Sequence, residues 1–299
     1  MIEHDERPLA ERAVALFRET QANITAALEL LDDGGRFRED RWERPGGGGG
    51  ASRVLEDGVV FERAGVNFSE VHGEVPAVLD PELRGEGAVF FAAGVSLVLH
   101  PKSPHIPTVH ANLRLIERGG KRWFGGGLDL SPAFPRKEDV VHFHRTLKAA
   151  CDRHDASHYP RFKQWCDEYF YIPHRKELRG VGGIFFDDLP PTEETFAFVR
   201  EVAACFLPAY VPIVERRKDV PWNDREREFQ LLRRGRYAEF NLVYDKGTVF
   251  GLKTGGRIES ILMSLPPKAR WAYDWKPLPN SQEEYAMTFF QPRDWAAGG

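Results

Sequence analysis

Cysteine is scarce in this sequence. The 299 residues include three cysteines, Cys151, Cys166 and Cys205, and no two of them form a Cys-x-x-Cys pair. An odd number of widely spaced thiols argues against a disulfide framework and against a thiolate zinc site. We therefore expect a protein of a reducing compartment, the cytoplasm.

Long apolar runs and charge of one sign are lacking too. The longest nearly apolar run, 88–99, is too short to cross a bilayer, and the charged N-terminus leads into no apolar signal core. We expect no transmembrane segment. The 41 basic and 45 acidic residues give a formal charge of −4, which offers no support for a nucleic-acid partner.

Hydrophobic periodicity predicts an α+β fold. Apolar residues at helical spacing predict an N-terminal helix within residues 1–35, over about 8–31. We predict strands over 54–66, 88–100, 108–117 and 122–130, then helices over 138–152, 159–171, 192–206 and 223–234. A hairpin of strands 237–244 and 248–252, a strand over 258–265 and a short helix from Ser281 follow. Closely connected strands favour antiparallel pairing in one domain over residues 1–299.

A glycine-rich segment covers residues 44–53 and contains five consecutive glycines. It does not end in the Lys-Ser/Thr pair of a phosphate-binding P-loop. We interpret it as a flexible loop, either a linker or a mobile lid, in preference to a phosphate cradle.

Histidine is concentrated in one stretch: eight of the ten lie between His100 and His174. In the predicted strand 108–117, alternation places His110, Asn112 and Arg114 on one face and apolar residues on the other. Ser96 lies on the polar side of the preceding strand. Imidazole, amide and guanidinium groups need partners when buried, so this face predicts a bound anionic or polar ligand.

Three further features leave alternatives open. His100, His110, His144 and His174 could hold a divalent metal only if the fold gathers them, since their spacing matches no compact metal motif. Asp129 follows Gly125-Gly-Gly127 and is either a buried carboxylate beside a flat ligand or part of a capped turn. The turn 254–257, with two glycines and Arg257, is an anion site or an ordinary turn.

Several ordered motifs resemble those of one family. They are Gly94-Val-Ser-Leu-Val-Leu-His-Pro101, Pro107-Thr-Val-His-Ala-Asn-Leu-Arg114, Trp123-Phe-Gly-Gly-Gly-Leu-Asp-Leu130, His142-Phe-His-Arg145, Trp165-Cys-Asp-Glu-Tyr-Phe-Tyr171, Arg179-Gly-Val-Gly-Gly-Ile-Phe-Phe-Asp-Asp188, Glu228-Phe-Gln-Leu-Leu-Arg-Arg-Gly-Arg236, Glu239-Phe-Asn-Leu-Val-Tyr-Asp245 and Gly255-Gly-Arg-Ile-Glu-Ser-Ile-Leu-Met-Ser264. Over about 46–275 the chain resembles the oxygen-dependent coproporphyrinogen III oxidase family.

The resemblance implies oxidative decarboxylation of two propionates of coproporphyrinogen III to vinyl groups, giving protoporphyrinogen IX in haem biosynthesis. It implies O2 as co-substrate and electron acceptor, no organic cofactor, and an open question over a divalent metal cation. It also implies a homodimer, with residues 237–272 in the region linked to dimer formation, and a large antiparallel sheet with helices on both faces.

The resemblance also implies roles for individual residues. His110 matches a proton donor, and Asp129 matches a carboxylate that holds the pyrrole N–H groups, so that His110, Asp129 and Arg114 are the expected catalytic residues. The positions that match substrate contacts are Ser96, Asn112, Leu113, Arg114, Gly255, Gly256 and Arg257. His100, His110, His144 and His174 match a metal site of bacterial members. Ala111 and Leu113 replace larger residues of the family, which leads us to expect an altered pocket shape.

Two other classes of function stay open on the sequence. One is a metal-dependent oxygenase or hydrolase that uses the four histidines. The other is a non-catalytic protein that binds a tetrapyrrole or another anion.

Overall fold

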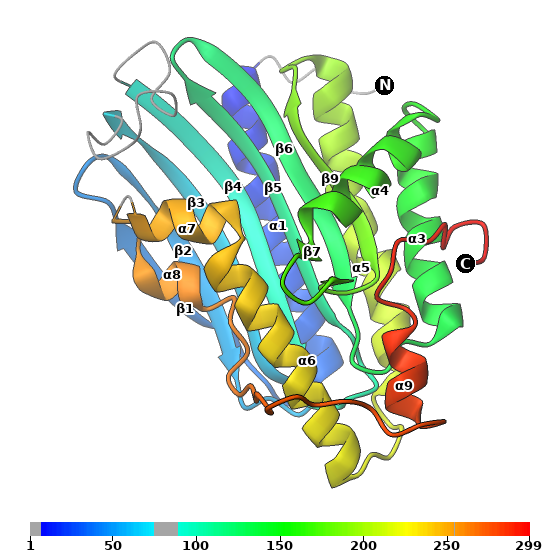
Figure 1. Cartoon of the computed structure of the whole chain (residues 1–299). Helices are drawn as coiled ribbons and strands as arrows, with labels where there is room; N and C mark the ends of the chain where they lie inside the picture. The colour runs from blue at the N-terminus through cyan, green and yellow to red at the C-terminus, as the bar shows by residue number, and fades with distance from the viewer. Residues whose placement is uncertain (1–6, 75–88, 254) are drawn as a thin grey trace.

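A seven-stranded antiparallel sheet forms the centre of the structure (Figure 1). The computed structural model describes residues 7–74, 89–253 and 255–299. The sheet order is β1-β2-β3-β4-β5-β6-β9, with β1 Arg38–Glu43, β2 Gly48–Glu56, β3 Phe61–Glu74, β4 Val89–Pro101, β5 Thr108–Arg118, β6 Lys121–Ser131 and β9 Gly182–Leu189. A separate pair joins β7 Tyr171–Ile172 to β8 Glu177–Leu178.

Helices lie on both faces of the sheet, which confirms the predicted α+β class. The described helices are α1 Leu9–Asp32, α3 Lys137–Asp152, α4 His158–Tyr169, α5 Glu193–Arg217, α6 Asp224–Val243, α7 Lys246–Lys253, α8 Ile258–Leu262 and α9 Gln282–Met287. In Figure 1, α6, α7 and α8 lie in front of the sheet and α1 lies behind it.

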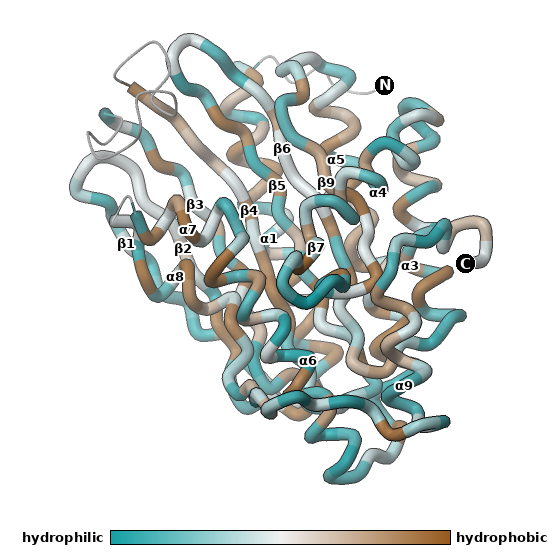
Figure 2. The backbone as a smooth tube through the Cα atoms, viewed as in Figure 1, coloured by the Kyte–Doolittle hydropathy of each residue, from teal (hydrophilic) through white to brown (hydrophobic). Residues whose placement is uncertain are grey.

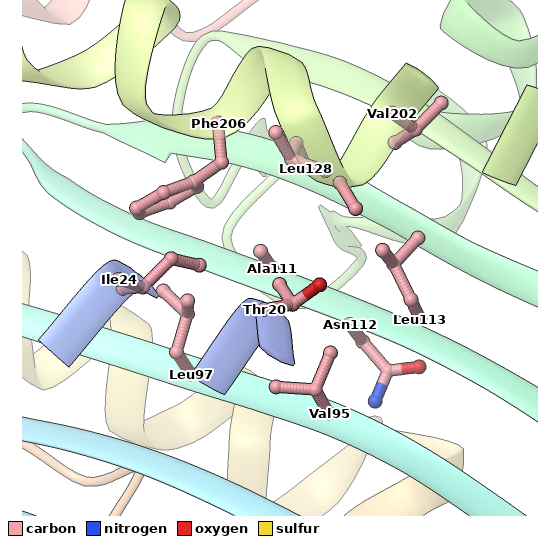
Figure 3. Close-up of a pocket in the computed structure, with 11 residues that line it drawn as sticks. Thr20, Ile24, Val95, Leu97, Ala111, Asn112, Leu113, Leu128, Val202 and Phe206 are labelled. Atoms are coloured by element: carbon pink, nitrogen blue, oxygen red, sulfur yellow. The ribbon is translucent and has the colours of Figure 1, made fainter. Parts of the chain in front are cut away.

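The rear face of the sheet is apolar and carries the main core. Val95 and Leu97 of β4 and Leu113 of β5 are buried there against α1 and α5. Figure 3 shows the side chains that pack here. The void between them has a volume of about 10 Å³, which is room for no more than about one water molecule. Figure 2 shows apolar residues concentrated in the sheet and its helices, with hydrophilic residues in the outer turns.

The front face of the same strands is polar because side chains alternate along a strand. In β5, His110, Asn112 and Arg114 are partly exposed, while the residues between them are buried. The predicted division of this strand into a polar and an apolar face is therefore confirmed.

The structure also confirms most of the predicted elements. It contains strands close to the predicted 88–100, 108–117 and 122–130, and helices close to the predicted 8–31, 138–152 and 159–171. The helix predicted over 192–206 begins as expected but continues to Arg217, through Pro208 and Pro212. The short helix after Ser281 is present as α9. Residues 1–6 and 88, at the edges of two predicted elements, lie outside the described residues.

The predicted hairpin at 237–252 and the strand at 258–265 are wrong. This region is helical, with α6 continuing to Val243 and followed by α7 and α8. The helix predicted over 223–234 does not end before Gly235, which lies inside α6. A Cβ on Gly235 would stand 2.6 Å from the carbonyl oxygen of Arg270. The glycine allows a chain segment to cross the helix closely and does not end it.

The predictions for residues 44–66 are wrong in two places. Gly48–Glu56 is a regular strand paired on both sides, not a flexible loop, and only the turn before it is irregular. The predicted strand 54–66 is interrupted by a turn, where buried Asp32 accepts hydrogen bonds from the backbone N–H groups of Val59, Val60 and Phe61. The sequence-based prediction also missed β1 and β9, the two edge strands of the sheet.

One helix within the described residues, α5, is long and apolar enough to cross a membrane by length and composition alone. Half of its apolar window is buried inside the structure. It packs against α1, α3 and the sheet, which is the environment of a core helix.

Candidate active site

A row of polar side chains crosses the front face of the sheet. Strand register places Asp40, Ser52, Asn67, Ser96 and Asn112 opposite one another on β1 to β5 in turn. The Ser52 hydroxyl lies 2.9 Å from Oδ1 of Asn67 and 2.8 Å from the hydroxyl of Ser260, on α8. The row thus forms a continuous polar floor beneath the helices of the front face.

The next row holds a buried chain of charged groups. His110 of β5 lies opposite Asp129 of β6, and its Nδ1 is 2.8 Å from Asp129 Oδ1. Arg179 donates to both oxygens of the same carboxylate, at 2.9 and 2.8 Å, and to Oδ1 of Asn241 at 2.8 Å. The Arg179 guanidinium also lies over the ring of Tyr237, 4.3 Å from its centroid. The Asp129 carboxylate is thus held from two sides.

Charge compensation keeps Asp129 ionised although it is only 2% exposed. Burial alone would raise the pKa of Asp129, but the positive charge of Arg179 and the hydrogen bond from His110 outweigh it and hold the pKa below its usual range. An ionised carboxylate can only accept hydrogen bonds, so His110 must carry a proton on Nδ1. Its Nε2 is left as the nitrogen available for chemistry.

Asp129 is less accessible to a ligand than His110 is. Its two oxygens already accept hydrogen bonds from His110 and Arg179, and the carboxylate lies beneath the imidazole. The His110 side chain is 25% exposed, whereas the Asp129 side chain is 3% exposed. His110 is therefore the residue that a ligand can contact, and Asp129 can orient the His110 ring through its hydrogen bond to Nδ1.

The two expected anion-binding arginines lie at different edges of the polar floor. Arg114 donates to Asn112 at 3.0 Å and to Asp187 of β9 at 2.7 Å. Arg257, which precedes α8, pairs with Asp40 of β1 and donates to Ser260 at 3.2 Å. Since β1 and β5 are four strand steps apart, the backbones at the two edges are separated by about 19 Å.

Glycines on neighbouring strands make room for Arg114. Gly94 and Gly125 are its partners in the strand register. A Cβ on Gly125 would collide with Oδ1 of Asp187 and stand 2.8 Å from Nε of Arg114. The glycine-rich motif of β6 is therefore required for the contact between Arg114 and Asp187.

The other expected substrate contacts are placed as follows. Ser96 is partly exposed on the polar floor, beside Asn112. Gly255 and Gly256 form the turn between α7 and α8, where Gly255 adopts φ 70° and an added Cβ would meet no atom of the described residues within 4 Å. Residue 254 of this turn lies outside the described residues.

Leu113 and Ala111 face the apolar side of the sheet, not the polar floor. Leu113 is 3% exposed and Ala111 is 7% exposed, and both line the small void shown in Figure 3. Only the main chain of Leu113 is available to a ligand. The expectation that these two substitutions reshape the pocket is wrong, because they alter packing against α1 and α5.

The four histidines considered as metal ligands are not gathered in this chain. His100 is fully buried, with Nε2 2.9 Å from the carbonyl of Ser264, and His144 is fully buried between Tyr159 and the carbonyl of Val181. Burial, with nearby Arg234 for His100 and Lys163 for His144, lowers the pKa of each to about 3.

The other two histidines have carboxylate partners. His110 bonds to Asp129, and His174 pairs with Glu239 at 2.7 Å. Over 7–74, 89–253 and 255–299 no three His, Cys, Asp or Glu side chains are grouped so that they could hold a metal ion. The donor set therefore does not fit a metal site, and we derive no step through one.

Sequence reasoning missed Arg179, Asp187 and Asp40 as members of the site. Arg179 and Asp187 belong to a motif that was recognised only as a family likeness. One of the two alternatives for Asp129, the buried carboxylate, carried a signal for Arg179, because a buried charge is costly unless it is paired. Nothing in the spacing identifies which arginine supplies it.

Nearly the whole chain matches a known family. A family model described as coproporphyrinogen III oxidase matches residues 12–295 of the 299-residue chain. The match includes β1 to β9 and places the polar floor, His110, Asp129 and both arginines inside the family region. The chain therefore belongs to the coproporphyrinogen III oxidase family.

Proposed function

We propose that this protein converts two propionate side chains of coproporphyrinogen III to vinyl groups with O2 as electron acceptor, giving protoporphyrinogen IX. The observation that carries the proposal is the polar floor, which has a carboxylate-binding arginine at each edge, Arg114 at β5 and Arg257 at β1. Beside the floor, buried Asp129 holds His110. Arginine suits this substrate because its planar guanidinium binds carboxylates at two points.

The proton balance of the reaction gives His110 a role. Each propionate that becomes a vinyl group releases CO2, two electrons and one proton. Reduction of O2 to hydrogen peroxide takes up those two electrons but requires two protons. One proton per decarboxylation must therefore be supplied. Nε2 of His110 can supply it, because Asp129 stabilises the protonated ring from the Nδ1 side.

The electrons can come from the substrate itself. A pyrrole ring of the porphyrinogen is electron-rich enough to react with O2, so the proposed reaction requires no flavin, haem or nicotinamide. We propose that a pyrrole peroxide formed in this way takes the proton from the propionate chain as CO2 leaves. The partly buried polar floor would favour this loss, since charge disperses as CO2 forms.

A homodimer is part of the proposal. Exposed apolar side chains gather at the end of α6, on α7 and α8 and in the segment that follows, namely Leu242, Val243, Phe250, Leu252, Ile258, Trp271 and Tyr273. Several large exposed apolar residues on neighbouring elements are typical of a protein interface. We also infer a cytoplasmic setting, which is supported by three free, buried cysteines.

Anaerobic mixing followed by air tests the function. The protein should bind coproporphyrinogen III without O2 and, after admission of air, release two CO2 per substrate and form a divinyl product. Binding without vinyl product would identify a non-catalytic tetrapyrrole-binding protein instead. Metal analysis and chelator treatment of the same preparation test the metal-dependent alternative, which loss of activity on chelation would support.

The variant His110→Gln separates catalysis from binding. We expect turnover to fall by about 10²- to 10⁴-fold, the usual contribution of a positioned proton donor, with little change in substrate affinity. The matched control is His154→Gln on the exposed surface, which should keep full activity. Turnover of His110→Gln within a few-fold of the unaltered protein would contradict the proposed role.

A further inference from the structure

Both arginines that would bind propionates already have carboxylate partners within the protein. Arg114 of β5 pairs with Asp187 of β9, and Arg257 before α8 pairs with Asp40 of β1. Each pair joins segments that are far apart in the sequence. The structure thus places a protein carboxylate where a substrate carboxylate would bind.

The first pair is only partly anchored. Oδ2 of Asp187 accepts from Arg114 at 2.7 Å, whereas Oδ1 is buried and has no hydrogen-bond partner among the described residues. The two side chains are 26% and 27% exposed. Arg114 is held independently by Asn112 Oδ1 at 3.0 Å, so it can keep its position when Asp187 moves away.

In the second pair, Arg257 with Asp40, the arginine likewise has a neutral partner beside its aspartate. Arg257 contacts Asp40 through one terminal nitrogen and Ser260 through the other, and the two charged side chains are 27% and 35% exposed. A hydroxyl therefore anchors the arginine on one side, as the Asn112 amide does for Arg114. Asp40 is again the partner that can be exchanged.

We propose that Asp187 and Asp40 are exchangeable counter-ions: each neutralises its arginine in the substrate-free protein, yields it to a propionate, and recovers it when that propionate has left as CO2. This inference rests on the proposed function, because it assigns the partners of Arg114 and Arg257. No bond is made or broken in the exchange, and one carboxylate replaces another on the same guanidinium.

The physical reason is the change in substrate charge during the reaction. Coproporphyrinogen III carries four carboxylates and its divinyl product carries two, so an arginine that held a reacting propionate would face an uncharged vinyl group. A partly desolvated charge without a partner is costly. An aspartate that can pair with the arginine again removes that cost. It also favours ligands with a carboxylate, because only a carboxylate can replace the aspartate on the guanidinium.

Asp187→Asn tests the exchange because it keeps the side-chain shape and removes the charge. The readout is the affinity for two unreactive porphyrins, coproporphyrin III with four carboxylates and protoporphyrin IX with two. We expect the variant to bind coproporphyrin III about fivefold more tightly, which corresponds to the strength of one partly exposed ion pair. The affinity for protoporphyrin IX should not change. The ratio of the affinity for coproporphyrin III to that for protoporphyrin IX should therefore rise.

Asp188→Asn is the matched control. It makes the same charge change at the adjacent position, where the side chain is exposed and the backbone adopts φ 54°, a conformation that asparagine accepts. The affinity ratio should be unchanged in this variant. The same comparison for Arg257 uses Asp40→Asn, with Glu43→Gln at the exposed end of β1 as its control.

The result separates exchange from a structural role. If Asp187 only holds Arg114 in place, Asp187→Asn will bind both porphyrins more weakly, and that outcome, or an unchanged ratio, overturns the proposal. Porphyrin binding needs no turnover. A failure of the proposed oxidative reaction would instead appear as missing vinyl product in the unaltered protein.

Discussion

The buried charge of Asp129 dominates the energetics at the scale of single residues. Two groups stabilise it: Arg179, itself 4% exposed, by its positive charge, and His110 by a hydrogen bond. Removing one partner of a buried pair leaves the other uncompensated, which costs about 3–5 kcal/mol. Asp129 therefore supports both the site and the fold.

We predict that Asp129→Ala lowers the free energy of unfolding by about 3–5 kcal/mol, because Arg179 would remain buried without a counter-charge. Urea denaturation measures the change. The double variant Asp129→Ala/Arg179→Met, which removes both charges, should recover part of the loss. The exposed control Asp219→Ala should stay within about 0.5 kcal/mol of the unaltered protein. An equally small loss in Asp129→Ala would show that Arg179 is solvated.

The sequence allowed the polar face of β5 to be predicted but not its partners. Alternation alone places His110, Asn112 and Arg114 on one side of a strand. Pairing Asp129 with Arg179, or Arg114 with Asp187, requires the strand register and the path of the chain after α4. Those contacts join residues 50 and 73 positions apart, and no local pattern encodes them.

At the scale of elements, α6 shows why a local pattern was misread. The alternating apolar residues after Tyr237 fit a strand, yet buried Arg233, Tyr237 and Phe240 also fit one face of a helix. Tertiary contacts favour the helix: Arg233 pairs with Glu177 of β8, and the Arg270 carbonyl crosses at Gly235. Long-range contacts of this kind override a weak local preference.

The crossing at Gly235 reverses the usual effect of alanine in a helix. Replacing an interior glycine by alanine normally stabilises a helix by about 1 kcal/mol. Here the added Cβ would stand 2.6 Å from the Arg270 carbonyl oxygen, and relieving such a contact costs about 1–3 kcal/mol. We predict that Gly235→Ala is destabilising in urea denaturation.

Gly247→Ala in α7 is the matched control. This helical glycine is exposed, and the nearest atom to its added Cβ is a side-chain oxygen of Asp245 at 3.3 Å. The control should be neutral or stabilised by up to about 1 kcal/mol. Stabilisation of Gly235→Ala to the same extent would mean that the segment at Arg270 moves away without cost.

At the scale of the whole molecule, the two faces of the sheet have different roles: one stabilises the fold and the other carries the polar site. Its rear face buries the apolar core against α1 and α5, while its front face holds the polar floor and the charged groups. The composition and strand spacing were sufficient to predict an α+β fold with an antiparallel sheet. The helical covering of the front face depends on residues after Gly235, where local signals favoured strands.

His100 and His144 tie the stability of the whole molecule to pH. Both are fully buried, and burial lowers the pKa of each to about 3 from an ordinary value of 6.5. Below pH 6.5 the unfolded chain therefore binds protons that the folded protein excludes, so stability is complete above pH 6.5 and is lost as the pH falls towards 3. At about pH 5 the loss is about 2 kcal/mol for each histidine.

Urea denaturation at about pH 7.5 and about pH 5 measures this loss. Over this window the carboxylates with lowered pKa values, such as Asp129 and Glu62, stay ionised and contribute little to the difference. His100→Gln should reduce the difference in unfolding free energy between the two pH values by about 2 kcal/mol, whereas His154→Gln on the surface should leave it unchanged. Equal stability of the unaltered protein at both pH values would show that these imidazoles accept protons in the folded state.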